Sequence, residues 1–135
     1  MLQALDLMQY DKRVDVVLVN IFGGGVVDMQ RLAEGIVVAR KLEVCTKPMV
    51  VRLRGMFEPE VNQIIQDFIE SEMAQSQAPI HLIKDMDLAV LEAVKIAAEK
   101  RNLRDQKKSH ERLQKIEKDQ NMIKSSQQKQ LHHQL

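Results

Sequence analysis

Three consecutive glycines stand where a strand is predicted to end and a helix to begin. Gly23, Gly24 and Gly25 follow the apolar segment VVLVNIF (residues 16–22) and precede Val26. Glycine lets a backbone approach a ligand closely, and the N–H groups at the start of a helix attract negative charge. We therefore predict a phosphate or carboxylate site at Gly23, Gly24, Gly25 and Val26. A plain turn between strand and helix, with no ligand, is the alternative.

The elements that position this loop alternate between strands and helices. The β-branched run before the glycines is typical of a strand buried on both faces, and Asp28 lies at the predicted start of the next helix. The alternation predicts an α/β domain with a parallel sheet and right-handed crossovers. We expect strands at residues 14–20, 49–53 and 80–83, and helices at residues 28–42, at residues 58–70 and after the turn at residues 84–87.

Apolar spacing also predicts the buried face of the helices. In the helix at residues 58–70, the inward positions are Val61, Ile64, Ile65 and Phe68. In the last helix of the domain, the same spacing argument selects Leu88, Leu91, Val94 and Ala98.

The composition changes after Ala98, so we predict a domain at residues 1–98 and a polar helical tail at residues 99–135. The tail is rich in Lys, Gln and Glu and has no glycine or proline. A short apolar seam on this tail is a candidate partner-binding surface and consists of Leu113, Ile116 and Ile123. A solvated helix is the alternative, and acidic residues in the tail argue against nucleic-acid binding.

Composition excludes several classes of function. The formal net charge is +1 and the aromatic residues are one Tyr and three Phe, so no nucleic-acid partner is expected. No apolar run approaches the ~20 residues of a membrane-spanning helix. The two adjacent histidines near the end of the tail have no further metal ligand at a suitable spacing, so we expect no metal and no cofactor.

Two single residues complete the candidates. The one cysteine, Cys45, is expected to be an ordinary loop or near-surface thiol. Arg52 lies in the second predicted strand, and its side chain is expected to point to the carboxyl end of the sheet, where ligands bind in α/β folds. It is either a ligand-binding residue or the ion-pair partner of Glu34, Asp85 or Asp87.

Four segments in order resemble one family, over about residues 4–97. NIFGG (residues 20–24), EGI (34–36), VVRLRG (50–55) and IHLIKDMDLAVLEAVKIA (80–97) are similar to the C-terminal ligase domain of the succinyl-CoA synthetase β subunit. The resemblance implies a flavodoxin-like, three-layer domain with a parallel sheet and, here, a C-terminal helical extension. In the family an ATP-grasp region precedes this domain, which opens with another strand. By that comparison our sequence starts inside the helix after that strand, and its sheet is incomplete.

The sequence departs from the family pattern in the glycine loop. The family places an aliphatic pair and commonly Arg-Cys-Asp after two glycines, where a phosphohistidine loop of the α subunit and succinate meet helix N-termini. Here Gly25 replaces the first aliphatic residue, and one extra residue precedes Gly35. An extra residue displaces backbone amides by up to ~3.5 Å. We therefore expect no catalytic residue in this loop and no ligase activity from the chain alone.

Two functions follow from the resemblance. The first is a non-catalytic accessory subunit that is a building block of a larger hetero-oligomeric assembly. The alternative is the C-terminal piece of a split succinyl-CoA ligase β subunit, which contributes the phosphohistidine and succinate loop. The implied partners are an ATP-grasp chain or an α-like subunit. The family implies the mitochondrial matrix, although residues 1–13 contain two aspartates and are unlike a transit peptide.

Overall fold

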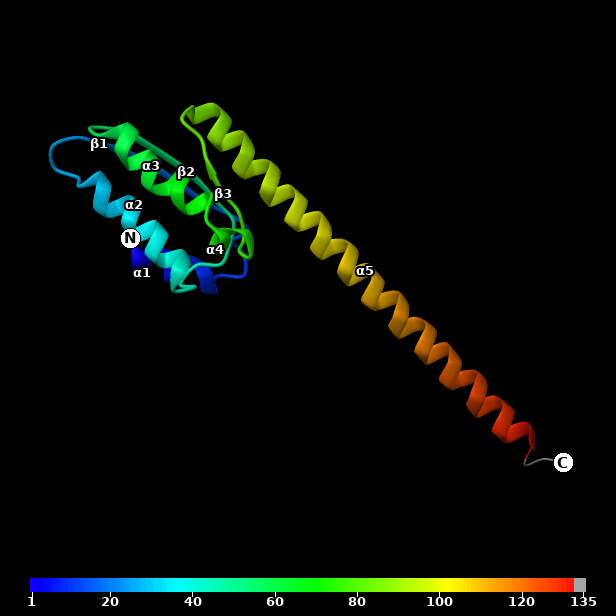
Figure 1. Ribbon diagram of the computed structural model, residues 1–135. Coiled ribbons are helices and arrows are strands. Elements are labelled where there is room, and N and C mark those ends of the chain that lie inside the picture. Colours follow the sequence, from blue (N-terminus) through cyan, green and yellow to red (C-terminus); the bar gives the residue numbers. More distant parts are fainter. Residues whose placement is uncertain (133–135) are drawn as a thin grey trace. The chain divides into compact units, whose positions relative to one another are not determined.

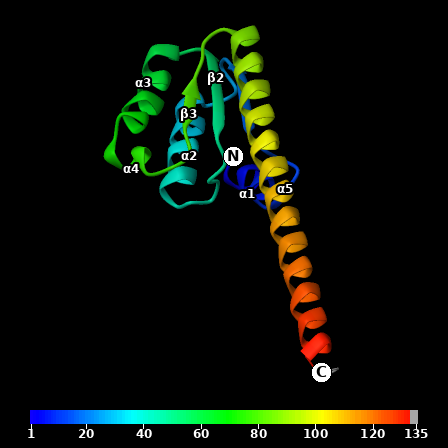
Figure 2. The same ribbon diagram turned by 90° about the vertical axis from the view of Figure 1, so that its right-hand side faces the viewer.

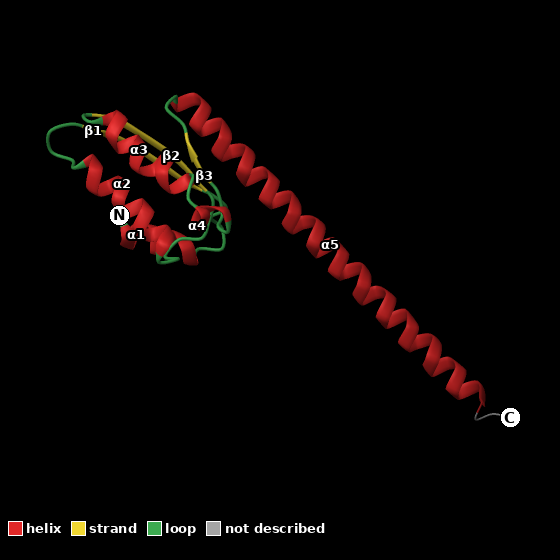
Figure 3. Cartoon of the chain, in the orientation of Figure 1, coloured by secondary structure: helices red, strands yellow, loops and turns green. Residues whose placement is uncertain are grey.

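The computed structural model describes the backbone of residues 1–132 and the side chains of residues 1–124 (Figure 1). The chain divides into two units, residues 1–98 and residues 99–135. Helices and strands alternate along the first unit (Figure 3). In order, the elements are α1 (Leu2–Tyr10), β1 (Val17–Gly23), α2 (Met29–Lys41), β2 (Met49–Gly55), α3 (Glu58–Ile69), α4 (Glu72–Gln75), β3 (Ile80–Leu82) and α5 (Met86–His132).

The first unit is built on a three-stranded parallel sheet with the order β1-β2-β3. This confirms the predicted α/β class with a parallel sheet and a C-terminal helical extension. β1 and β2 are in register from Val17 opposite Met49 to Gly23 opposite Gly55. Both strands therefore run further toward their glycines than the apolar runs predicted, and the short helix α4 was not predicted.

One face of the sheet carries the main core. Helices α1, α2 and α3 bury apolar side chains against it, and Figure 2 shows α2 and α3 beside the strands. Helix α2 starts as predicted, because Asp28 Oδ1 accepts the backbone N–H of Arg31 at 3.0 Å. In α3 the spacing argument holds, since Val61, Ile65 and Phe68 are buried.

The opposite face of the sheet carries a smaller cluster, in which Val50 contacts Ala89, Ala93 and Ile96 of α5. The predicted buried face of this helix is therefore wrong. Leu88, Leu91 and Val94 are 58%, 63% and 61% exposed, and Ala98 is exposed as well. The alanines let the helix axis come close to the sheet, which leaves the larger side chains on the outer side.

Strand β1 is not buried on both faces, contrary to the prediction. Val17 and Val19 are buried in the main core, whereas Leu18, Asn20 and Phe22 are exposed. β1 lies at one edge of the sheet in the described part of the chain. Residues 86–98 of α5 cover Val50 of the neighbouring strand, whereas none of the described helices buries Leu18 or Phe22 of β1.

Cys45 lies in a loop, as one of the two predicted alternatives has it, but it is fully buried, so the near-surface alternative is wrong. It lies in the connection between α2 and β2. The guanidinium of Arg40, itself only 1% exposed, donates hydrogen bonds to the carbonyl oxygens of Cys45, at 2.8 Å, and of Lys47. Burial lowers the pKa of Arg40 below its usual value. A buried cation therefore holds this connection in place.

Candidate functional site

The glycine loop and the loop after β2 lie at the same edge of the sheet, because β1 and β2 are parallel and end in register. The backbone N–H of Met56 donates to the carbonyl oxygen of Gly23 at 3.2 Å and joins the two loops. Together they surround a cavity of about 360 Å³. Its lining consists of Gly25, Val26, Val27, Asp28, Met29, Gln30, Met56 and Phe57.

The glycines serve the backbone in different ways. A Cβ on Gly55 would lie 1.7 Å from the carbonyl oxygen of Gly23, and Gly55 has a φ of +133°. Gly25 has a φ of +59°, whereas a Cβ on Gly24 would meet no atom within 4 Å. In the sequence, Gly55 stands out only as the last residue of the segment VVRLRG (50–55). Its close approach to Gly23 depends on strand register, for which a single sequence carries no signal.

Two interactions within the chain lie at the predicted anion site. The backbone N–H of Val26 donates to the carbonyl oxygen of Gly24 at 2.6 Å. The carboxylate of Asp28 caps the first turn of α2 and pairs with the Arg31 side chain at 3.2 Å. A second anion at this helix start would meet the negative charge of Asp28. The structure thus brings Gly23, Gly24, Gly25 and Val26 into one loop, in which the N–H of Val26 already has an acceptor.

The rim of this cavity is apolar and exposed. Val26 is 97% exposed, Phe57 68%, Met56 54% and Val27 44%. We call these four side chains the apolar rim. Phe57 has a φ of +57°, an uncommon conformation for a bulky residue, and it directly precedes α3. Clustered apolar side chains at a loop edge are typical of surfaces that contact other proteins.

The arginines near this edge are bound within the domain. Arg52 donates to the carbonyl oxygen of Lys84 at 3.0 Å and to Asn20 Oδ1 at 3.1 Å. The predicted ion pair of Arg52 with Glu34, Asp85 or Asp87 is therefore wrong among the described residues. Arg54 pairs with Glu58 at 3.0 Å.

Asp85, one of the predicted partners of Arg52, has a different role at the start of α5. Its carboxylate accepts the backbone N–H of Leu88 at 2.9 Å. Among the side chains that the structure describes, no group of three or more His, Cys, Asp or Glu could hold a metal ion.

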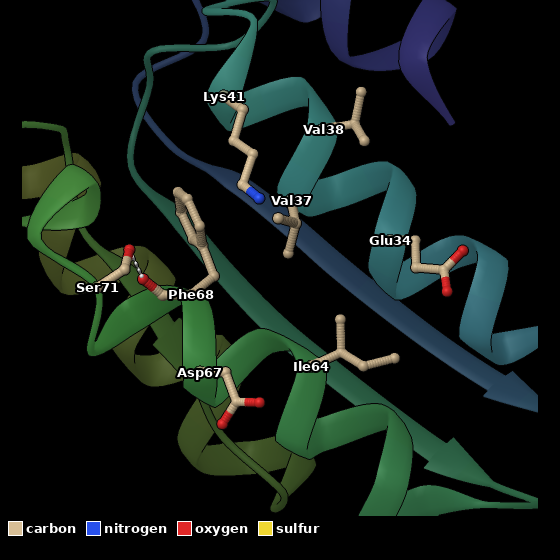
Figure 4. Close-up of a pocket in the computed structure, with 8 residues that line it drawn as sticks. All are labelled: Glu34, Val37, Val38, Lys41, Ile64, Asp67, Phe68 and Ser71. Carbon is tan, nitrogen blue, oxygen red and sulfur yellow. Dashed lines mark hydrogen bonds between the residues drawn. The ribbon is translucent and has the colours of Figure 1, made fainter.

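A second concavity lies between α2 and α3 and measures about 440 Å³ (Figure 4). Sequence reasoning did not find it, because it depends on how the two helices pack. Figure 4 shows Lys41 and Phe68 at one end and Glu34 at the other, with Asp67 next to Phe68 on α3. The two carboxylates accept hydrogen bonds from Gln30 and Gln63 of their own helices. The lining consists of Glu34, Val37, Val38, Lys41, Ile64, Asp67, Phe68 and Ser71.

The second unit, residues 99–135, contains the predicted partner-binding residues of the tail. Leu113, Ile116 and Ile123 are all exposed on α5. Every side chain described between residues 99 and 124 is exposed. Within the described residues, no helix is long and apolar enough to cross a membrane.

The chain is similar in sequence to β subunits of succinate–CoA ligases. No family model matches the chain. It is 35% identical over 97 residues to the ADP-forming succinate–CoA ligase β subunit 2 of Archaeoglobus fulgidus, which covers 72% of the chain and 23% of that relative. The β subunit of Herpetosiphon aurantiacus is 47% identical over 64 residues, 47% of the chain and 17% of the relative. The hydrogenosomal β subunit of Neocallimastix frontalis is 33% identical over 95 residues, 70% and 20% respectively.

These similarities confirm the predicted relationship to the β subunits of succinate–CoA ligases. The chain spans only about a fifth of the length of the curated relatives it matches.

Proposed function

We propose that this chain, a relative of the succinate–CoA ligase β subunits, is a non-catalytic interaction subunit of a larger assembly. The observation that carries the proposal is that the cavity at the glycine loop is lined by the Asp28 carboxylate and by exposed apolar side chains. Asp28 holds the helix position that an anionic ligand would take, and the apolar rim surrounds it. This edge of the sheet is therefore better suited to contact with a protein than to chemistry on a small anion.

The partner that suits the apolar rim is a protein with an apolar surface of its own. A succinyl-CoA synthetase α-like subunit is the first candidate, since the proteins similar to this chain are β subunits of a ligase. The tail adds a second contact through Leu113, Ile116 and Ile123, which are exposed on a polar helix. Our proposal also places the assembly in the mitochondrial matrix, with the hydrogenosomal name of one relative as support.

The split ligase remains a second candidate because of one feature of the sheet. Among the described strands, β1 has a neighbour on one side only. A strand from an ATP-grasp chain would find backbone donors and acceptors on the other side. The two functions differ in turnover of succinyl-CoA when an ATP-grasp chain is added to the purified protein. Turnover would favour the split ligase, and its absence the accessory subunit.

Phosphate and succinate are expected to leave the melting temperature unchanged. A site with a Kd of about 1 mM would add about 1.4 kcal/mol at 10 mM ligand, or several degrees in a domain of this size. We expect a shift below about 1 °C in a thermal melt at matched ionic strength, because Asp28 repels the ligand. A larger shift that Gly24→Val removes would show that the loop still binds anions. That variant should remain folded, since a Cβ at this position meets no atom within 4 Å.

Substitution of Val26 by aspartate is expected to weaken binding to an α-like subunit about 10-fold, because it places a charge in the centre of an apolar contact. The domain itself should be as stable as before, since Val26 is 97% exposed. Leu7→Asp is the matched control, because Leu7 is also apolar and exposed but lies on α1. Binding is measured by titration calorimetry. Equal affinities of the two variants would contradict the proposed function.

A further inference from the structure

The first turns of α5 carry apolar side chains on two opposite sides. Ala89, Ala93 and Ile96 contact the sheet. The outer face, formed by Leu88, Leu91, Val94 and Ala98, faces away from it and is exposed. Isolated exposed leucines are ordinary, but here three large apolar side chains follow one another at every third residue. A row of large exposed apolar side chains on a helix is typical of a surface that another protein covers.

The charges on this face are arranged symmetrically about Leu91. Asp87 lies four residues before Leu91, and Lys95 lies four residues after it. Leu88 and Val94 are likewise three residues before and three after. Among the described residues, neither Asp87 nor Lys95 forms an ion pair. If the sequence is read backwards from Leu91, the position of Asp87 is taken by Lys95. The position of Leu88 is taken by Val94, which is also apolar.

We propose that the outer face of α5 binds a second copy of this chain, with the two helices antiparallel and crossing at Leu91. In this arrangement Leu91 of each copy meets Leu91 of the other. Leu88 lies level with Val94 of the second copy, and Asp87 lies level with Lys95. One twofold axis relates the contacts, as in most homodimers. The two Asp87–Lys95 pairs select the antiparallel direction, because parallel helices would bring like charges to the same level.

The contact is small, so the dimer is expected to be weak and reversible. Four side chains per copy bury less surface than a standard interface of about 800 Å² on each partner. We expect a Kd on the order of ten micromolar. The outer face of α5 and the apolar rim have no residue in common, so substitutions can test the two contacts separately. If the dimer does not form, the proposed function is unaffected. If the proposed function is refuted, the dimer proposal is unaffected.

Charge reversal on the full chain tests this arrangement by sedimentation equilibrium. Asp87→Lys and Lys95→Asp each create two like-charge contacts and should weaken the dimer at least 10-fold. The double variant, with both changes, restores opposite charges at both contacts and should dimerise as the wild type does. Lys107→Asp is the control, because it makes the same change outside the outer face. A monomeric wild type at about 100 μM, or a double variant as weak as the single ones, would overturn the proposal.

Disulfide cross-linking gives a second, independent measurement of the same geometry. The background is Cys45→Ala, which removes the chain's one cysteine. Leu91→Cys should then form a covalent dimer under mild oxidation. Ala98→Cys should not, because at 1.5 Å per residue the two positions 98 lie about 21 Å apart along the antiparallel helices. Equal cross-linking at both positions would indicate parallel helices and refute the model, as would no cross-linking at position 91.

Discussion

Replacing Gly55 with alanine is expected to lower the free energy of unfolding by about 3–5 kcal/mol. Two effects add at this position. The new Cβ would lie 1.7 Å from the carbonyl oxygen of Gly23, a backbone atom that moves only if the two strands separate. The φ of +133° is also strained for any residue with a side chain. Urea unfolding followed by circular dichroism measures the change, and the melting temperature should fall by ~15 °C or more.

Gly24→Ala is the matched control, because Gly24 belongs to the same pair of loops and its Cβ would meet no atom within 4 Å. Its free energy of unfolding should change by less than about 1 kcal/mol. Two variants of similar stability would show that the strand ends are not packed as described. They would also weaken the account of the cavity, since the same contact between Gly23 and the loop after β2 sets its width.

The sequence predicts structure best where that structure depends on residues close together in the chain. Asp28 was predicted at the start of α2 and caps it through the N–H of Arg31. Val61, Ile65 and Phe68 were predicted to face inward from α3, and they do. In both cases the decisive pattern lies within one turn or one helix of the chain. The strand and helix alternation that gave the parallel sheet is of the same kind.

Predictions failed where burial depends on what covers a surface. Periodicity could not choose between the two apolar sides of α5, and the small residues Ala89 and Ala93, rather than Leu91, face the sheet. The apolar run in β1 suggested cover on both faces, but Phe22 is exposed because no described helix lies over it. The spacing of apolar residues predicts which side chains share a face of a helix or strand. It does not predict whether another element covers that face.

The anion site at the glycine loop stays a prediction, because a motif does not show which of its backbone groups already have partners. Its composition was read correctly as a turn of high backbone freedom, with Gly25 at a positive φ. The hydrogen bond from Val26 to Gly24 and the carboxylate of Asp28 at the helix start were not visible in the pattern. A motif shows that amides can converge, and only the fold shows whether they are already bound.

Replacing Arg40 with methionine is expected to destabilise the domain by about 2–4 kcal/mol. Methionine fills a similar apolar volume but donates no hydrogen bond. The carbonyl oxygens of Cys45 and Lys47 would lose their donor, and an unpaired buried acceptor costs about 1–3 kcal/mol. Removal of a desolvated cation offsets part of this loss. Urea unfolding measures the balance, and limited proteolysis should cut first in the connection between α2 and β2.

Arg31→Met separates this effect from the loss of positive charge alone. Arg31 lies on the same helix, but its side chain is 86% exposed and pairs only with Asp28 at the surface. We expect it to change the free energy of unfolding by less than about 0.5 kcal/mol. Arg40→Lys should be almost as unstable as Arg40→Met, because one ammonium cannot reach both carbonyls as a planar guanidinium does. If Arg40→Met proved as stable as the wild type, desolvation of the buried cation would outweigh its two hydrogen bonds. Arg40 would then determine the path of the connection without stabilising the domain.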